Sequence, residues 1–175
     1  HRTIFERAAN PIVRLSMDGT ILDCNHQVER VFGYPMSELR GQPARLLIHP
    51  DDHARLHADL ADIRELETYY RRHYRAIHHD GHGIDIEVDA ALGQGAGGDL
   101  EIICLVADVS ARLRSERLER LSHRLLRIFH EHDQLEDLAR AFCDEVRSST
   151  GCAAVAVRGQ EPDGAAPWLA SCGFP

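Results

Sequence analysis

The sequence predicts an α+β fold, in which a five-stranded antiparallel sheet with short helices on one face precedes a long helical linker and a partial second α+β unit. Three observations lead to this prediction. Residues 84–92 alternate apolar and acidic side chains, which is the period of a half-buried strand. The Asp-Gly pairs at 18–19 and 80–81 each separate two strand-like runs, and the first predicts a two-residue hairpin turn. From residue 110 onward the chain is charged and follows a helical period.

The first half of the predicted sheet unit combines a hairpin with unusually short helices. A strand over residues 11–17 is expected to return as a second strand over 21–25. Short helices are predicted at 26–33 and 35–41, and each ends at a glycine that tolerates left-handed backbone angles. Such short helices suggest a wall around a cavity over the sheet, because a compact core would favour one long amphipathic element.

The second half begins with the first long helix, over residues 49–66. Leu56, Leu60 and Ile63 have the i, i+4, i+7 spacing of its buried face. Three strands are expected to follow, over residues 68–79, 83–92 and 100–108. The glycine run at 93–98 precedes a strand rather than a helix, so it predicts a hairpin loop and not a phosphate-binding loop.

The rest of the chain is predicted to form a linker helix and a smaller unit. Four apolar residues spaced 3, 4 and 3 apart indicate a coiled-coil seam of about two heptads: Leu118, Leu121, Leu125 and Ile128. A second helix over 134–148 and two short strands should follow. The predicted division of the chain is 1–109 for the sheet unit, 110–133 for the linker and 134–175 for the second unit.

Composition excludes several classes of function. The formal net charge is −8 and all 20 basic residues are arginine, so neither a nucleic-acid binder nor a lysine-dependent phosphate or Schiff-base site is expected. No apolar run approaches the roughly 20 residues of a membrane span. The five cysteines are scattered without a C-x-x-C pair, which favours reduced thiols and a cytoplasmic protein.

Taken in order, several short motifs in the sheet unit resemble a PAS domain over roughly residues 5–109. They are DGTILDCN, VERVFGYPMSELRG, HPDD, HHDGHGIDIEV and ADVS. The resemblance implies that the short helices form one wall of a pocket over the five-stranded sheet. It also implies that Asn25 lies at the lip of this wall and caps the helix that follows.

The C-terminal 42 residues resemble the start of a GAF domain, with a helix and two strands in HDQLEDLARAFCDEVRSSTGCAAVAVR and WLASC. This resemblance implies a multidomain sensor. Its output domain, absent from this chain, would be a histidine kinase or a cyclic-dinucleotide enzyme.

The ligand of the predicted pocket is left open by the sequence. PAS domains hold flavin, haem, a metabolite or nothing. Flavin is disfavoured because GQPARLLIHPDD lacks the reactive cysteine of the photoreceptors and the sole tryptophan, Trp168, lies in the tail. Haem is an alternative, with His53 and His57 on one face of the long helix. The candidate pocket residues are these two histidines, Asn25 and Tyr74.

Metal and catalytic sites are not expected. The histidines of HHDGH, at 78–82, flank a hairpin turn and lack a visible fourth ligand for zinc, and HEHD at 130–133 has the same weakness. Serine and cysteine residues come without a recognisable base and orienting partner. The chain by itself is therefore predicted to have no enzymatic activity.

The sequence as a whole predicts a sensory module. A small-molecule or other intracellular signal would change the sheet and its exit at Asp108 and Ser110, and a parallel homodimeric helix would relay the change. One alternative is a haem-type gas or redox sensor. Another is a ligand-free dimerisation module ahead of a diguanylate cyclase or phosphodiesterase.

Overall fold

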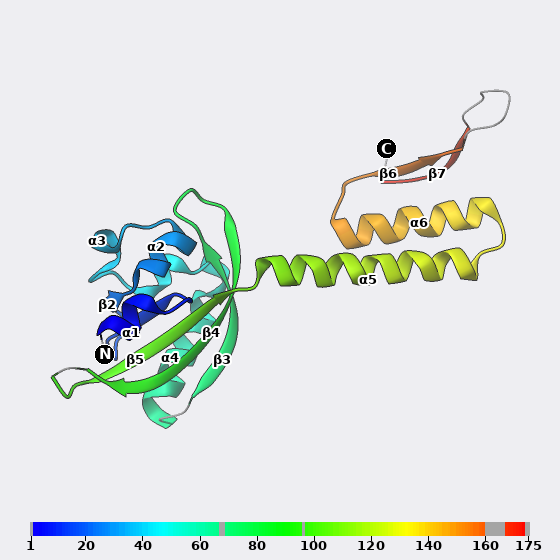
Figure 1. Ribbon diagram of the computed structural model, residues 1–175. Helices are drawn as coiled ribbons and strands as arrows, with labels where there is room; N and C mark the ends of the chain where they lie inside the picture. Colours follow the sequence, from blue (N-terminus) through cyan, green and yellow to red (C-terminus); the bar gives the residue numbers. More distant parts are fainter. Residues whose placement is uncertain (1, 67–68, 96, 160–166, 174–175) are drawn as a thin grey trace. The chain divides into compact units, whose positions relative to one another are not determined.

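The structure is a computed structural model that describes residues 2–66, 69–95, 97–159 and 167–173 (Figure 1). It divides into two compact units, His1–Leu113 and Arg114–Pro175. The helices and strands, in chain order, are α1 (Arg2–Arg7), β1 (Ile12–Leu15), β2 (Ile21–Cys24), α2 (His26–Phe32), α3 (Met36–Leu39), the 3-10 helices η1 (Ala44–Leu47) and η2 (Pro50–Asp52), α4 (His53–Leu66), β3 (Tyr70–Ile77), β4 (Gly83–Gln94), β5 (Leu100–Asp108), α5 (Ser110–Glu131), α6 (Leu135–Thr150), β6 (Val155–Arg158) and β7 (Trp168–Cys172).

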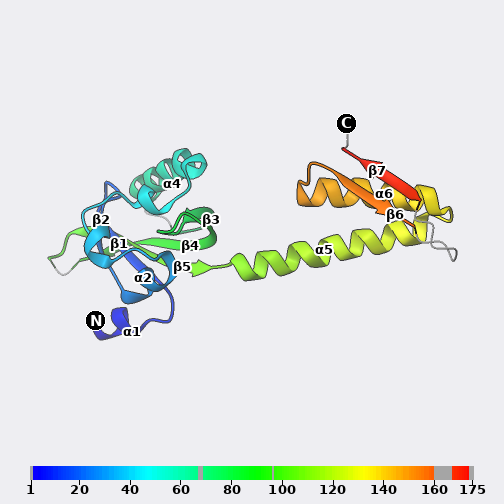
Figure 2. The same cartoon turned by 90° about the horizontal axis from the view of Figure 1, so that it is seen from above.

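The first unit is built on one antiparallel sheet with the strand order β2-β1-β5-β4-β3. Its longest pairing joins β4 to β5, from Ile86 opposite Asp108 to Gln94 opposite Leu100. The short helices and α4 are arranged around this sheet (Figures 1 and 2). The predicted α+β class and the five-stranded sheet are therefore confirmed.

Both Asp-Gly pairs lie in hairpin turns, but the first turn is longer than predicted. Leu15 pairs with Ile21, so residues 16–20 connect β1 to β2. The side chains of Ser16 and Asp18 accept hydrogen bonds from the Thr20 N–H at 3.1 and 3.2 Å, which supports the wider loop. The two-residue turn was therefore wrong, because these side chains compete with backbone pairing of the strands.

The helices of the first unit follow local rules. α2 ends at Gly33, as predicted, with a φ of +75° and an N–H that donates to the Glu29 carbonyl at 2.8 Å. In α4 the predicted stripe of Leu56, Leu60 and Ile63 is buried. Side chains from these helices complete the core that the sheet begins.

The alternation predicted for β4 is also present. Its buried side chains are Ile84, Ile86, Val88 and Ala90, whereas Asp85, Glu87 and Asp89 on the other face are partly exposed. Opposite β4, the buried residues of β5 are Ile102, Cys104 and Val106 together with Glu101. The glycine-rich segment begins inside β4 and continues into the β4–β5 loop, in which residue 96 lies outside the described residues.

The second unit consists of α5 from Arg114 onward, α6 and a two-stranded sheet. α5 and α6 are joined through an ion pair between Arg124 and Glu145, at 2.7 Å, and an edge contact of Phe129 with Phe142. α6 ends at Gly151, as predicted. β6 and β7 pair antiparallel and both contact α6, and most of the predicted turn at 159–164 lies outside the described residues.

In the described part of the chain, no helix combines the length and apolarity that crossing a membrane requires.

Candidate functional site

A small cavity lies inside the first unit, between the sheet and the helices that cover it. Its volume is about 50 Å³. Side chains from four strands, β1, β3, β4 and β5, and from α2, η1 and α4 line it, together with Ile48: Val13, Leu15, Phe32, Ala44, Leu47, Ile48, Leu56, Leu60, Tyr70, Tyr74, Ile86, Val88, Cys104 and Val106. The cavity is almost wholly apolar, so it suits a small hydrophobic or amphipathic guest.

The two tyrosines of β3 connect this cavity to a polar network centred on the buried Asp59. The Tyr74 hydroxyl donates to Asp59 Oδ2 at 2.5 Å, and Arg72 Nε donates to Asp59 Oδ1 at 3.1 Å. Asp59 is only 5% exposed, so these two donors satisfy a carboxylate that water hardly reaches. The Arg72 guanidinium also lies 5.5 Å from the centre of the Tyr70 ring.

Both phenols remain neutral at physiological pH. Burial, followed by the hydrogen bond to Asp59, raises the pKa of Tyr74, and burial raises the pKa of Tyr70 to about 12. A neutral tyrosine oxygen keeps lone pairs that can accept a hydrogen bond. The cavity wall is thus almost wholly apolar, and the hydroxyl of Tyr74 is engaged by Asp59 beside it.

Tyr74 is the one predicted pocket residue that lines the cavity. Asn25 is completely buried but holds the chain ahead of β1: its Oδ1 accepts from the Ile12 N–H, and its Nδ2 donates to the carbonyls of Phe5 and Asn10, each at 3.0 Å. It makes no side-chain cap to α2, so the predicted capping role was wrong. Its amide is used up by long-range backbone partners, which sequence rules for caps do not anticipate.

The two histidines predicted for the pocket lie outside it. His53 Nε2 is within hydrogen-bond distance of the carbonyl oxygens of Ile48 and Arg45, at 2.8 and 3.1 Å, and His57 is exposed on α4. Helix periodicity explains the error, because Leu56 and Leu60 take the buried face of α4 and leave His57 on the other. A cavity of about 50 Å³ without a lining histidine does not fit haem.

The exit from the sheet is tied to β4 beside the cavity. The Asp85 N–H donates to Ser110 Oγ, and the Val109 N–H donates to the Asp85 carbonyl, both at 2.9 Å. Asp108 Oδ1 accepts from the Ser110 N–H at 2.9 Å, so the two predicted exit residues contact each other. Asp85 is the immediate neighbour of Ile86, which lines the cavity.

The HPDD motif fastens the start of α4 to the edge strand β3. The Asp52 carboxylate accepts three hydrogen bonds from Arg75, from the backbone N–H at 2.8 Å and from the guanidinium at 2.9 and 3.3 Å. Asp52 is 7% exposed. The side-chain bond to Arg75 is the main reason that its pKa falls to about 2. The motif thus positions one wall of the cavity.

Replacing Asp52 with asparagine should lower the free energy of unfolding by about 2 kcal/mol at pH 7, since the folded state holds the carboxyl pKa nearly two units below its ordinary value. A depressed carboxyl pKa stabilises the fold fully above about pH 4, and this stabilisation is lost as the pH falls toward 2. Urea unfolding of both proteins at several pH values should therefore show the difference shrinking below pH 4. The exposed neighbour provides the control, because Asp51→Asn should change stability by no more than about 0.5 kcal/mol. Equal losses in the two variants would contradict this role of Asp52.

The predicted seam on α5 is divided between two environments. Ile128 is buried, Leu121 and Leu125 are half-buried and Leu118 is exposed. Ile128 is therefore already covered within a single chain. The prediction that all four residues of the seam are free to contact a partner was wrong for Ile128. Other apolar side chains of the same helix, Leu126 and Phe129, are exposed instead.

Sequence reasoning did not find Asp59, Tyr70 and Arg72. A signal for Asp59 was present, because it lies at i+3 from Leu56 and immediately before Leu60, on the apolar face of α4. An acidic residue at such a position needs a buried partner. The partner could not be read from the sequence, since it comes from a strand that follows α4.

The sequence of residues 1–109 matches the family described as PAS fold. No curated protein matches the chain.

Solved structures with the same fold include the PAS domain of a protein from Colwellia psychrerythraea, with 22% identity and a TM-score of 0.56 over 63% of this chain and 94% of that one. A domain of a sensory box sensor histidine kinase/response regulator from Geobacter sulfurreducens has 23% identity and a TM-score of 0.53, covering 61% and 90%. A third structure is the PAS domain, in complex with ethanol, of a LuxR-family transcriptional regulator from Burkholderia thailandensis. It has 18% identity and a TM-score of 0.54 over 63% of this chain and 97% of that one.

Proposed function

Since this chain belongs to the PAS family, we propose that it is a sensory module that binds a small amphipathic molecule in its cavity and relays the event through α5. One observation carries the proposal. Ile86 lines the cavity. Its neighbour Asp85 holds the exit to α5 through two hydrogen bonds: its N–H donates to Ser110 Oγ, and its carbonyl accepts from the Val109 N–H. A guest that moves β4 therefore acts on the exit directly.

The proposed ligand is a small molecule with an apolar body and one hydroxyl group. Its body would occupy the apolar cavity. Its hydroxyl would reach the oxygen of Tyr70 or Tyr74 only after the surrounding side chains adjust, because the cavity wall presents almost no polar surface. The cavity accepts only a few atoms at its present size, so a larger ligand would have to displace the helical wall. The ethanol complex of the similar PAS domain from Burkholderia thailandensis supports a ligand of this kind.

We also propose that the chain acts as a parallel homodimer through α5. Leu118, Leu125 and Phe129 are spaced 7 and 4 residues apart, which places them on one face of the helix. Leu118 and Phe129 are exposed, with Leu126 beside them. A second copy of the same helix would cover this stripe by coiled-coil packing.

In this proposal the chain binds and relays but does not catalyse, and its output domain lies outside these 175 residues. A histidine kinase is the output that we favour, because a similar domain belongs to a sensor histidine kinase. The α6, β6 and β7 segment would be the first part of a GAF-like domain between sensor and output. Two strands on one helix are the support for this reading.

The cavity and the relay can be tested together by NMR titration with ethanol and longer primary alcohols. We expect shifts of the backbone amides at Tyr70 and Ile86, which report the cavity, and at Asp85, Val109 and Ser110, which report the exit. Val106→Ile should suppress both sets, because the added methyl group fills part of the cavity. Val28→Ile, an equal enlargement at a buried site outside the cavity lining, should leave both responses in place.

Each half of the proposal has its own contrary outcome. If no alcohol shifts the cavity amides, the ligand proposal is wrong. If the cavity amides shift while the exit amides stay unchanged, the relay through Asp85 is wrong.

A further inference from the structure

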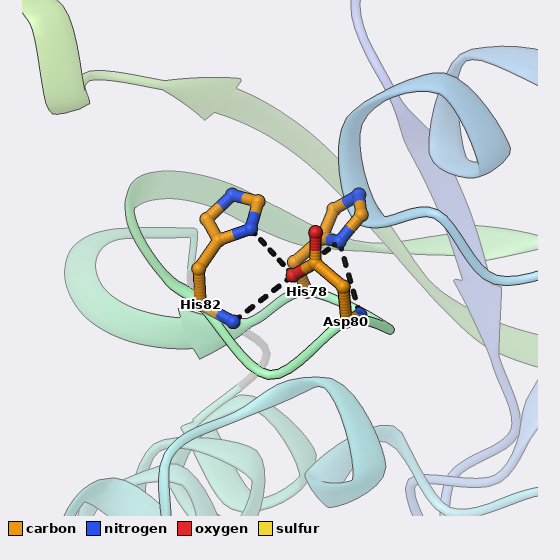
Figure 3. A group of neighbouring side chains, drawn as sticks. All are labelled: His78, Asp80 and His82. Carbon is orange, nitrogen blue, oxygen red and sulfur yellow. Dashed lines mark hydrogen bonds and ion pairs between the residues drawn. The ribbon is translucent and has the colours of Figure 1, made fainter.

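Two histidines and an aspartate converge at the turn between β3 and β4. Nδ1 of His78 and Nδ1 of His82 both approach Oδ1 of Asp80, at 3.0 and 2.6 Å (Figure 3). The three candidate ligand atoms all lie within 4.8 Å of one another. Among the residues that the structure describes, this is the one group of three or more potential metal-binding side chains with such spacing.

We propose that His78, Asp80 and His82 bind a divalent transition-metal ion of the Zn²⁺ type. Imidazole nitrogen and carboxylate oxygen are both ligands of Zn²⁺, with bonds of about 2.0–2.2 Å. Tetrahedral geometry with such bonds separates neighbouring ligand atoms by about 3.3 Å. The two His–Asp separations of 2.6 and 3.0 Å are shorter than this, and all three atoms lie within 4.8 Å of one another, so an adjustment of the side chains would admit an ion.

The sequence argued against a metal here because a fourth protein ligand was missing. That objection applies to a closed structural zinc site, whereas three protein ligands with water in the remaining position form an open site. The side chains of Asp80 and His82 are 61% and 59% exposed, so an ion reaches them from solvent. An open, accessible site favours reversible binding over a permanent structural role.

The turn itself arranges the ligands before any ion arrives. The His78 N–H donates to the His82 carbonyl at 2.9 Å, and the His82 N–H donates to Asp80 Oδ1 at 3.1 Å. The imidazole rings of the two histidines are stacked, with centroids 4.4 Å apart. The folded hairpin therefore already restricts the three side chains, which lowers the entropy lost when an ion binds.

The site is also attached to the helical wall of the cavity. The His78 ring lies so close to Gly33 that a Cβ atom at that position would be 2.5 Å from its Cε1 and Nε2 atoms. The adjacent His79 N–H donates to the Phe32 carbonyl at 2.8 Å, and Phe32 lines the cavity. A bound ion would hold the turn against the end of α2. Binding of the metal ion would thus act on α2 without requiring a ligand in the cavity.

Calorimetric titration of the metal-free chain with zinc chloride should give one ion per chain. Removing a residue that only hydrogen-bonds to a metal ligand typically weakens metal binding by about 10–100-fold. Asp80→Asn and His82→Gln each remove a direct ligand, so each should weaken zinc binding by at least about tenfold. These two exposed positions are preferred over His78, whose ring packs against Gly33. In an NMR titration, zinc should shift the amides of residues 78–82 and of Gly33.

Control variants remove histidines elsewhere. His57→Gln, on the exposed face of α4, and the double variant His130→Gln/His132→Gln, in the HEHD segment, should bind zinc as the unmodified chain does. Circular dichroism checks that every variant is folded. The proposal is overturned if the unmodified chain binds no zinc, if Asp80→Asn and His82→Gln bind it normally, or if the HEHD variant loses the ion.

Discussion

Replacing Asn25 with alanine should lower the free energy of unfolding of the PAS unit by about 3 kcal/mol, since it leaves up to three backbone groups without partners at about 1–3 kcal/mol each. The Ile12 N–H and the carbonyls of Phe5 and Asn10 would lose their bonds to a side chain that is completely buried. Asn10 is itself exposed, so water would recover part of the loss there. The lead-in to β1 should loosen as a result.

The measurement can be restricted to this unit. All four tyrosines precede residue 75 and the single tryptophan is Trp168, so tyrosine near-ultraviolet circular dichroism in urea reports the PAS unit, whereas tryptophan fluorescence reports the other. Asn10→Ala is the matched control and should change stability by no more than about 0.5 kcal/mol, because only its backbone takes part. A loss below about 1 kcal/mol in Asn25→Ala would show that its three bonds contribute little.

The double variant Leu118→Asp/Leu126→Asp should convert a dimer into a monomer while the PAS unit keeps its fold. These side chains are 67% and 55% exposed in the single chain, so their replacement leaves the packing of α5 on α6 largely unchanged. A dimer would lose four buried leucines, at about 1.5–3 kcal/mol for each complete burial. Even at partial burial, a loss of about 4 kcal/mol weakens association about a thousandfold. Sedimentation velocity at tens of micromolar measures the change.

The control for this variant places the same charge on exposed leucines of the other unit. Leu46 and Leu100 are 40% and 50% exposed, and the variant Leu46→Asp/Leu100→Asp should remain dimeric. A monomeric unmodified chain, or a dimer that survives the α5 substitutions, would refute dimerisation through this stripe.

Local chemistry made much of the PAS unit predictable. Gly33 ends α2 because only its left-handed backbone suits that position, and the alternation of β4 follows from a sheet with one buried face. The buried stripe of α4 follows in the same way from helical periodicity. Residues close in sequence carry each of these signals, so no knowledge of the tertiary structure was needed.

The candidate site was predicted only in outline. The short helices pointed to a cavity, and Tyr74 does line one. His57 was misplaced, because a spacing of four puts two residues near each other without saying which face is buried. Asn25 was expected to cap α2, a local role, yet its partners lie 13 to 20 residues earlier in the chain.

Local signals in the sequence predicted the order of elements in this protein, the positions of the hairpins in the sheet and the apolar face of α4, because backbone preference and hydrophobic period act over a few residues. Packing between distant segments set the size of the cavity, the pairing of Asp59 with Tyr74 and Arg72, and the burial of Ile128. It also decided that the side chains of His78, Asp80 and His82 meet at one point. These features depend on which side chains fill a shared space, and that is settled when distant segments pack together.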